Sequence, residues 1–239
     1  MEDQPALPVA FNIETAANEQ AREGMPKPDV KFGRTKDPAK KEEMVKEARE
    51  KQRQSLALDC NFGRVIAFSF VWKNRGNDER SSAVEVIKSN DDDGERELLA
   101  QLWKMVLRMR DAGRFLVTFN GSGFDIPFIL RRSAAHRAPV PVHVETGKYR
   151  TMGLHSGFHC DLMRTLHESE TSEALKIPHT LGFYVNYLLG ESFPFDGLDQ
   201  STLGSLLEQE NGRVTIETLC RWNSSQTLAL YERLQQIYP

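Results

Sequence analysis

Residues 117–130 read VTFNGSGFDIPFIL, and they are the most informative segment of the sequence. An apolar strand is predicted over Arg114–Asn120, a loop with two glycines follows, and a helix is predicted over Phe124–His136. Glycine lets a ligand's backbone approach the chain closely. Asp125 stands where the loop meets the first helical turn, so its position suits a helix cap and a ligand-binding carboxylate equally.

The chain before this stretch is rich in strand patterns. Apolar and β-branched residues predict strands over Leu7–Thr15, Arg64–Lys73 and Ser82–Ser89, with a turn composition at residues 74–77. A stripe of apolar residues at helical spacing predicts a helix over Asp93–Asp111.

The chain after this stretch is mainly helical. We expect a short strand over Phe158–Met163, helices from Pro178 onward and a long final helix over Thr215–Ile237. The order is three strands, a helix, a strand, a helix, a strand and then helices. This order predicts an α/β protein in which helices pack against a mixed sheet.

A charged segment at about residues 22–58 interrupts the strand pattern. Asp37 followed by Pro38 predicts the start of a helix that ends near Leu58. Between Arg22 and Arg53 there are 11 Lys or Arg and 7 Asp or Glu, an excess of four positive charges. We expect an exposed helix with a narrow apolar stripe. The charge suits either phosphate binding or a solvated helix face.

Length and composition narrow the class of protein. The 239 residues suit one large domain, which we expect to cover residues 1–239 with the charged segment as an insertion. The net charge of −3 is no global sign of nucleic-acid binding. No apolar run approaches the ~20 residues of a membrane helix. Three scattered cysteines indicate reduced thiols, so we expect a cytoplasmic protein without a membrane partner.

A second short motif lies in the first predicted strand, at Asn12-Ile13-Glu14-Thr15. Residues two apart on a strand point to the same face. Two carboxylates in this arrangement bind a divalent ion through oxygen ligands. This chain supplies one carboxylate, Glu14, and one neutral amide, Asn12. Taken alone, the motif favours a polar strand end without chemistry.

Together, these segments resemble a known family. Asn120-Gly121-Ser122-Gly123-Phe124-Asp125 resembles the second motif, Asn-Gly-x-x-Phe-Asp, of the DnaQ-like (DEDD, RNase H-like) 3′–5′ exonucleases. The likeness is greatest to the group related to the proofreading exonuclease domain of family B DNA polymerases. Residues 12–15 resemble its first motif, Asp-x-Glu, and residues 219–223 fall at its third, Tyr-x-x-x-Asp. Residues 159–162 resemble its His-x-Asp-Leu strand, and residues 195–197 an Asp-Gly that precedes its last helix.

The resemblance implies an RNase H-like mixed five-stranded sheet flanked by helices, and a site with two Mg²⁺ or Mn²⁺ ions bound by four carboxylates. The four ligand positions here are Asn12, Glu14, Asp125 and Asn223, of which Glu14 and Asp125 keep the carboxylate. Leu219 stands where the family has a tyrosine that positions the attacking water. Asn120, Gly121 and Phe124 then correspond to the substrate-binding loop.

Two amides in place of carboxylates halve the negative charge, from about −4 to about −2, that faces two divalent ions. Glu217 and Glu232 lie on other faces of the predicted final helix than Asn223, so neither replaces a lost carboxylate. Deliberate Asp→Asn replacement and natural loss both explain the amides, and Leu219 and Ser224 favour natural loss.

The sequence therefore predicts a 3′–5′ exonuclease-like protein acting on the 3′ end of DNA or RNA, with weak or lost activity. The alternative is a non-catalytic module that keeps the fold to bind nucleic acid or a protein partner. In either case we expect the side chains of Asn12, Glu14, Asp125 and Asn223 to converge in one cleft, about 5–8 Å apart.

Overall fold

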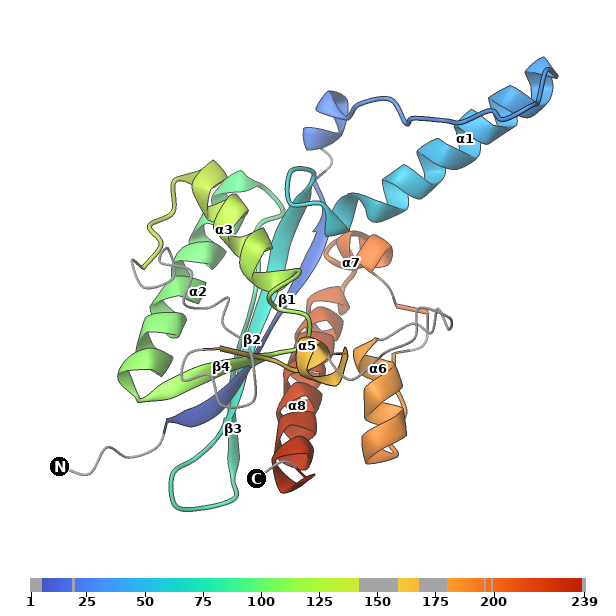
Figure 1. The fold of residues 1–239 in the computed structure, drawn as a ribbon. Coiled ribbons are helices and arrows are strands. Elements are labelled where there is room, and N and C mark those ends of the chain that lie inside the picture. Colours follow the sequence, from blue (N-terminus) through green and yellow to red (C-terminus); the bar gives the residue numbers. More distant parts are fainter. Residues whose placement is uncertain are drawn as a thin grey trace.

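The fold is seen in a computed structural model, which describes residues 6–18, 20–141, 159–167, 180–195, 197–198 and 200–237. A twisted sheet runs through the body, and helices lie on both of its faces (Figure 1). Part of two predicted features, Phe158 in a strand and Asp196 in the Asp-Gly pair, lies outside the described residues.

The sheet has five strands in the order β3-β2-β1-β4-β5. They are β1 (Leu7–Ala17), β2 (Gly63–Lys73), β3 (Arg80–Val86), β4 (Arg114–Thr118) and β5 (His159–Asp161). β1, β4 and β5 run parallel, whereas β2 is antiparallel to both β1 and β3. This arrangement confirms the predicted α/β fold with a mixed five-stranded sheet.

The helices divide between the two faces of the sheet. The longer ones are α1 (Pro38–Ser55), α2 (Asp92–Asp111), α3 (Asp125–His136) and α8 (Gly212–Ile237). The shorter ones are α5 (Leu162–His167), α6 (Leu181–Tyr184) with a π-helical turn over Val185–Leu189, α7 (Gln200–Leu206), and 3-10 turns over Ala21–Gly24 and Leu56–Leu58. No helix among the described residues is both long enough and apolar enough to cross a membrane.

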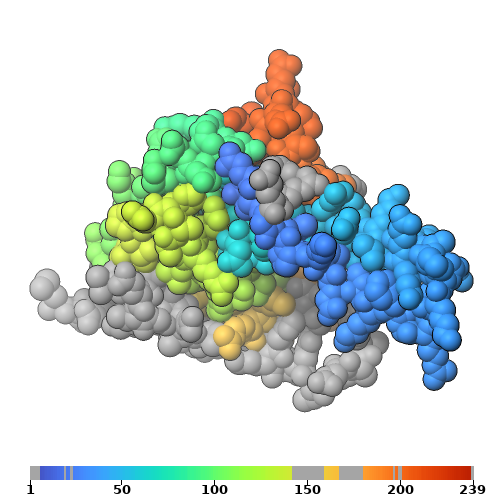
Figure 2. All heavy atoms as spheres, turned by 90° about the horizontal axis from the view of Figure 1, so that it is seen from above, coloured from blue at the N-terminus to red at the C-terminus, as the bar shows by residue number. Residues whose placement is uncertain are grey.

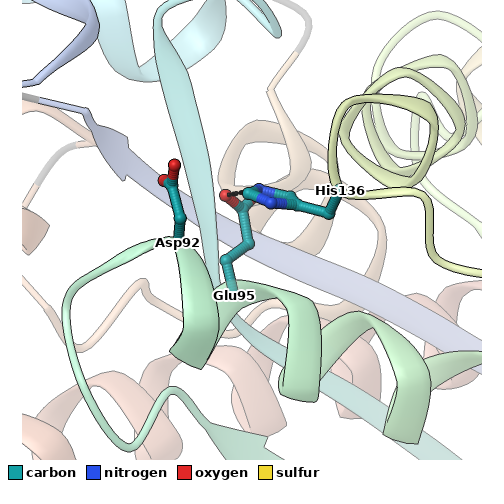
Figure 3. A group of neighbouring side chains, drawn as sticks. All are labelled: Asp92, Glu95 and His136. Carbon is teal, nitrogen blue, oxygen red and sulfur yellow. Dashed lines mark hydrogen bonds and ion pairs between the residues drawn. The ribbon is translucent and has the colours of Figure 1, made fainter.

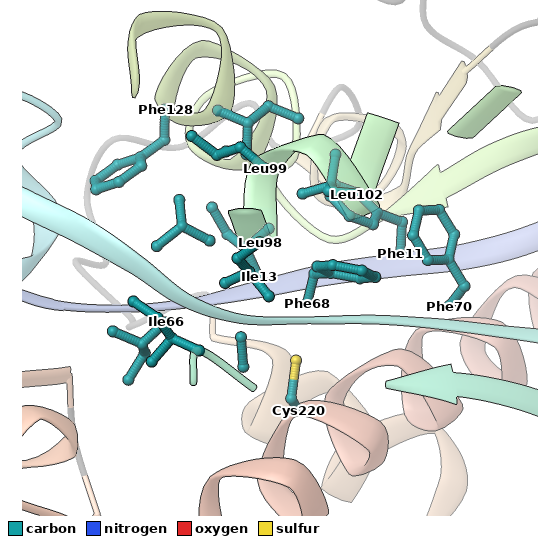
Figure 4. Close-up of a cluster of buried hydrophobic side chains, with 14 of the residues drawn as sticks. Phe11, Ile13, Ile66, Phe68, Phe70, Leu98, Leu99, Leu102, Phe128 and Cys220 are labelled. Carbon is teal, nitrogen blue, oxygen red and sulfur yellow. The ribbon is translucent and has the colours of Figure 1, made fainter. Parts of the chain in front are cut away.

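The main core lies between the sheet and the helices α2 and α3. Paired positions of β1 and β2, Phe11 with Phe70 and Ile13 with Phe68, point to this face and pack beneath leucines of α2 (Figure 4). Cys220 of α8 lies on the opposite face of the sheet in the same view. The intervening residues of β1, including Asn12 and Glu14, therefore point toward α8.

Several predicted boundaries are wrong by a few residues. β1 ends at Ala17 rather than Thr15, and α8 begins at Gly212 rather than Thr215. Three other elements also differ. β4 ends at Thr118 rather than Asn120, because Asn120 has φ of 65° and leaves the extended conformation. β5 ends at Asp161, and Leu162 already begins α5. β3 covers residues 80–86 rather than 82–89, because Asp91 starts a helix cap by accepting a hydrogen bond from the backbone N–H of Gly94, 2.8 Å away.

The charged insertion forms an arm, residues 25–55, that projects from the body (Figures 1 and 2). It consists of an extended strap, residues 25–37, and α1, none of whose residues is buried. The strap runs antiparallel to α1: the Gln52 side chain donates to the Pro26 carbonyl at 3.0 Å, and the Lys41 ammonium lies 5.6 Å from the centroid of the Phe32 ring. The structure thus confirms the predicted exposed helix.

Candidate functional site

The site lies where β1 and β4 separate. The two strands pair only from Leu7 to Ala10 on β1, so beyond Ala10 the edge of β1 that faces β4 has no strand partner among the described residues. The backbone N–H of Ile13 on this free edge donates to Asp125 Oδ1 at 3.1 Å. Asp125 is the first residue of α3, but its recorded hydrogen bonds come from Ile13 and from its own backbone N–H. Asp125 therefore ties α3 to β1 and does not act as the helix cap.

Glu14 is the centre of a small polar cluster beneath α8. Its carboxylate is buried, and Oε1 accepts hydrogen bonds from the side-chain amides of Asn12 and Asn223, each at 2.8 Å. These contacts are shorter than the expected separation of about 5–8 Å between ligands of a shared ion, because the amides donate directly to the carboxylate. The structure thus brings Asn12, Glu14 and Asn223 together, with Asp125 close enough for Glu14 to raise its pKa.

The position of Asn223 is set by how α8 packs on the sheet. The hydroxyl of Ser69, on β2, donates to the Cys220 carbonyl at 2.7 Å and also contacts the hydroxyl of Ser224. The small side chains let the helix lie close to the strands. Leu219 of α8 is a buried apolar side chain, so no polar group occupies the position at which the family has its tyrosine.

The loop before Asp125 is held by a residue to which we assigned no role from sequence. Asp161, fully buried at the end of β5, accepts backbone hydrogen bonds from Asn120 at 2.8 Å and Ser122 at 2.9 Å. An acidic residue at the carboxyl end of a strand parallel to β4 was the signal in the sequence. Asp161 therefore shapes the loop that presents Asp125.

Neighbouring side chains fill the space beside both glycines of the loop. A Cβ on Gly121 would lie 2.2 Å from Thr118 Oγ1, and one on Gly123 would lie 2.5 Å from Asn120 Oδ1. Thr118 Oγ1 also contacts Nε2 of the buried His159 at 2.7 Å. The side chains of Asn120 and Phe124 remain partly exposed, whereas Gly121 is buried.

The pKa of Asp125 is raised to about 7, mainly by burial and to a lesser degree by the charges of Glu14 and Asp161, against the lowering effect of its hydrogen bonds. Burial, followed by the charge of Glu14, also raises the pKa of the Cys220 thiol well above its usual range. Both shifts reflect a site that is dry and already rich in negative charge.

The raised pKa of Asp125 predicts a pH-dependent stability. The unfolded aspartate ionises near 3.8, whereas the folded one keeps its proton up to about pH 7. Between pH 3.8 and about pH 7, unfolding therefore releases a proton. The contribution of Asp125 to the free energy of unfolding is fully present below pH 3.8 and is lost as the pH rises through about 7. We expect Asp125→Asn to match the wild type near pH 4 and to exceed its free energy of unfolding by about 2–4 kcal/mol at pH 8.

Urea unfolding at several pH values, with EDTA present, measures this difference. Asparagine keeps an oxygen that can accept from the Ile13 N–H, so the substitution removes mainly the ionisation. Asp29→Asn, at an exposed position in the arm, is the control and should show no such gain. Equal pH slopes for Asp125→Asn and the wild type would contradict the assignment.

The residues around Glu14 do not fit a two-ion site as they stand. Both neighbouring amides present N–H groups to the carboxylate, where a cation needs oxygen atoms. No other acid compensates from α8: Glu217 pairs with Arg221, and Glu232 pairs with Lys73 and Arg80. For two ions to bind, both amides would have to rotate and lose their hydrogen bonds to Glu14.

A second group of possible ligands lies elsewhere. Asp92, Glu95 and His136 have ligand atoms within 4.8 Å of one another, and they are the one such cluster found among the described residues (Figure 3). Glu95, however, is fully buried and already accepts hydrogen bonds from Arg132 Nε at 2.9 Å and from an Arg132 terminal nitrogen at 2.6 Å. A guanidinium thus occupies the place of a metal.

Arg64 adds a second buried cation to this group. Its terminal nitrogen lies 2.9 Å from Asp92 Oδ1, and its Nε lies 3.7 Å from Glu95 Oε2. Glu95 also accepts the backbone N–H of Val65 at 2.9 Å. The cluster joins β2, α2 and α3 by ion pairs, so we interpret it as structural.

Fold and site together define the class of protein. The mixed sheet in the order β3-β2-β1-β4-β5, with acidic side chains at the fork between β1 and β4, is the architecture of an RNase H-like exonuclease domain. The model of one family, predicted 3′–5′ exonucleases related to the exonuclease domain of PolB, matches residues 57–184. This is more than half of the chain, and the protein belongs to this family.

The matched range contains part of the site. Asp125 and the loop before it fall within residues 57–184, whereas Asn12 and Glu14 on β1 and Asn223 on α8 fall outside. A search of curated proteins found no match to this chain.

Proposed function

We propose that this protein binds the 3′ end of a nucleic acid at the β1–β4 fork and that its metal-dependent hydrolysis is weak or lost. The observation that carries the proposal is the pair of 2.8 Å hydrogen bonds from Asn12 and Asn223 to Glu14. Family membership supports the nucleic-acid substrate.

The electrostatics support a loss of hydrolysis. A carboxylate that accepts two amide N–H groups keeps its charge without a metal ion, because hydrogen bonds to a charged group contribute about 1.5–3 kcal/mol each. Asp125 is held partly protonated near neutral pH by its burial. We propose that Glu14 and Asp125 bind at most one Mg²⁺ or Mn²⁺, and weakly.

Substrate binding rests on other groups. We propose that Asn120, Gly121 and Phe124 contact the terminal nucleotide, because the loop lies directly before Asp125 and two of its side chains are partly exposed. A partly exposed aromatic ring such as Phe124 is suited to stacking on a base. We further propose that residues 1–239 form one such domain, with the arm as its insertion.

The test is a nuclease assay on a 3′-labelled oligonucleotide with Mn²⁺. We expect the wild type to release label no faster than Glu14→Gln, which keeps the size of the side chain and removes its charge. Calorimetric titration of the wild type with Mn²⁺ should show weak binding or none.

Two outcomes would contradict the proposed function. Rapid release of label that Glu14→Gln abolishes would show that the amides permit catalysis and would overturn the proposed loss. Absence of oligonucleotide binding in EDTA at low salt would favour the alternative, a module that keeps the fold for a protein partner.

A further inference from the structure

The arm carries all of the local excess of positive charge at its outer end. Its tip, residues 31–41, contains five Lys or Arg and one Asp. Residues 25–30 contain one charge of each sign, and the base, residues 42–55, contains four of each sign. The tip comprises the second half of the strap and the first helical turn of α1, where Phe32 contacts Lys41, and it lies farthest from the body (Figure 1).

The cations of the tip are available for a partner. Lys31, Arg34, Lys36 and Lys40 are exposed, and within the described part of the chain none of them forms an ion pair. Lys41 is half-buried against the Phe32 ring and keeps the strap on the helix. Exposed charges of one sign that have no internal counter-charge attract an oppositely charged polymer.

The arm is rooted at the end of β1, the strand that carries Asn12 and Glu14. The chain leaves β1 at Ala17, three residues after Glu14, and returns at Gly63. Backbone hydrogen bonding of Asn18 to Phe62, at 2.8 Å, closes this root, and the buried Leu56 and Ala57 anchor it. A polymer that enters the fork can therefore reach the arm.

We propose that the arm tip binds the phosphate backbone of the nucleic acid whose 3′ end lies at the β1–β4 fork. This inference rests on the proposed function. The 18 residues of α1 span about 27 Å at about 1.5 Å per residue, which matches about eight stacked nucleotides at about 3.4 Å each. The arm thus acts on oligonucleotides longer than about eight nucleotides and leaves shorter ones unaffected.

Two variants with the same change in charge test the proposal. The tip variant carries Lys31→Gln, Arg34→Gln, Lys36→Gln and Lys40→Gln. The base variant carries Lys46→Gln, Arg49→Gln, Lys51→Gln and Arg53→Gln. All eight positions are exposed, so neither variant removes buried contacts. Circular dichroism and thermal unfolding check that both fold as the wild type does.

Binding is measured by fluorescence anisotropy with a labelled single-stranded DNA of about 20 nucleotides, in EDTA and over a range of salt concentrations. We expect the tip variant to bind at least about tenfold more weakly than the wild type at low salt. The slope of log affinity against log salt concentration should become shallower by about 3, because four phosphate contacts at about 0.7 each are lost. The base variant should lose clearly less. On an oligonucleotide of about five nucleotides, the tip variant and the wild type should bind equally.

Equal losses in the two variants, or a loss by the tip variant on the short oligonucleotide as well, would overturn the proposal. Absence of binding to single-stranded and duplex DNA and RNA at low salt would also overturn it and would point to an acidic protein surface instead. Because the assay contains EDTA, Glu14-dependent hydrolysis found in the nuclease assay would refute the proposed loss of activity without affecting this result.

Discussion

In EDTA, the double variant Asn12→Asp, Asn223→Asp is expected to unfold about 10 °C below the wild type, and Mn²⁺ is expected to restore most of that loss. The wild type should show little response to Mn²⁺. The reason is that Glu14 now accepts two amide N–H groups, each at 2.8 Å. Two new carboxylates would replace these donors by like charges next to a buried acid.

The size of the effect follows from the lost hydrogen bonds. Two bonds to a charged group contribute about 3–6 kcal/mol together, and each kcal/mol shifts the unfolding temperature by about 2–4 °C in a protein of this length. Added Mn²⁺ binds the folded state of the variant and stabilises it by mass action. Nuclease activity should then exceed that of the wild type, although Leu219 still supplies no hydroxyl.

The control for the double variant is Asn186→Asp, Asn211→Asp, which makes the same change in charge at exposed positions of the chain. Differential scanning fluorimetry with and without Mn²⁺ compares all three proteins. An unchanged unfolding temperature in EDTA would show that Asn12 and Asn223 do not stabilise Glu14. A strong Mn²⁺ response of the wild type would show that the amides do bind an ion.

The second large effect is expected at Glu95. Glu95→Gln removes the charge that faces Arg132 and Arg64, whose side chains are 7% and 3% exposed. Breaking a buried ion pair leaves an uncompensated charge, and the cost is about 3–5 kcal/mol. Urea unfolding at pH 7 should show this as a lower midpoint with an unchanged slope.

Glu97→Gln on the same helix is the matched control. Glu97 pairs with Lys88, but both side chains are largely exposed, so the substitution should change the midpoint little. If Glu95→Gln and Glu97→Gln behave alike, the cluster is not structural, and its possible role as a metal site should be examined again.

The loop before Asp125 could be predicted because its chemistry is local. Asn tolerates the positive φ found at residue 120, and small residues follow it at the two positions where a side chain would clash. The long helices and the order of strands and helices along the chain were likewise visible in short periodic patterns. The misplaced boundaries depended on caps and turns that a periodic pattern does not specify.

Contacts between distant residues could not be predicted in this way. The sequence shows an asparagine at residue 223, but not that its amide donates to a carboxylate 209 positions earlier. The same holds for Glu95, whose partners Arg64 and Arg132 come from two other elements. The excess charge of the arm could be counted from the sequence, but only the structure shows that it lies at the outer end.

The fork between β1 and β4 has a consequence for spectroscopy. Because the edge of β1 that faces β4 has no strand partner beyond Ala10 among the described residues, the backbone N–H of Ile13 has Asp125 as its acceptor. The amide proton of Ile13 is thus a natural reporter for the site. Its chemical shift follows the ionisation of Asp125, and its rate of exchange with solvent follows the opening of the fork, so NMR can observe both events in the unmodified protein without a bound ligand.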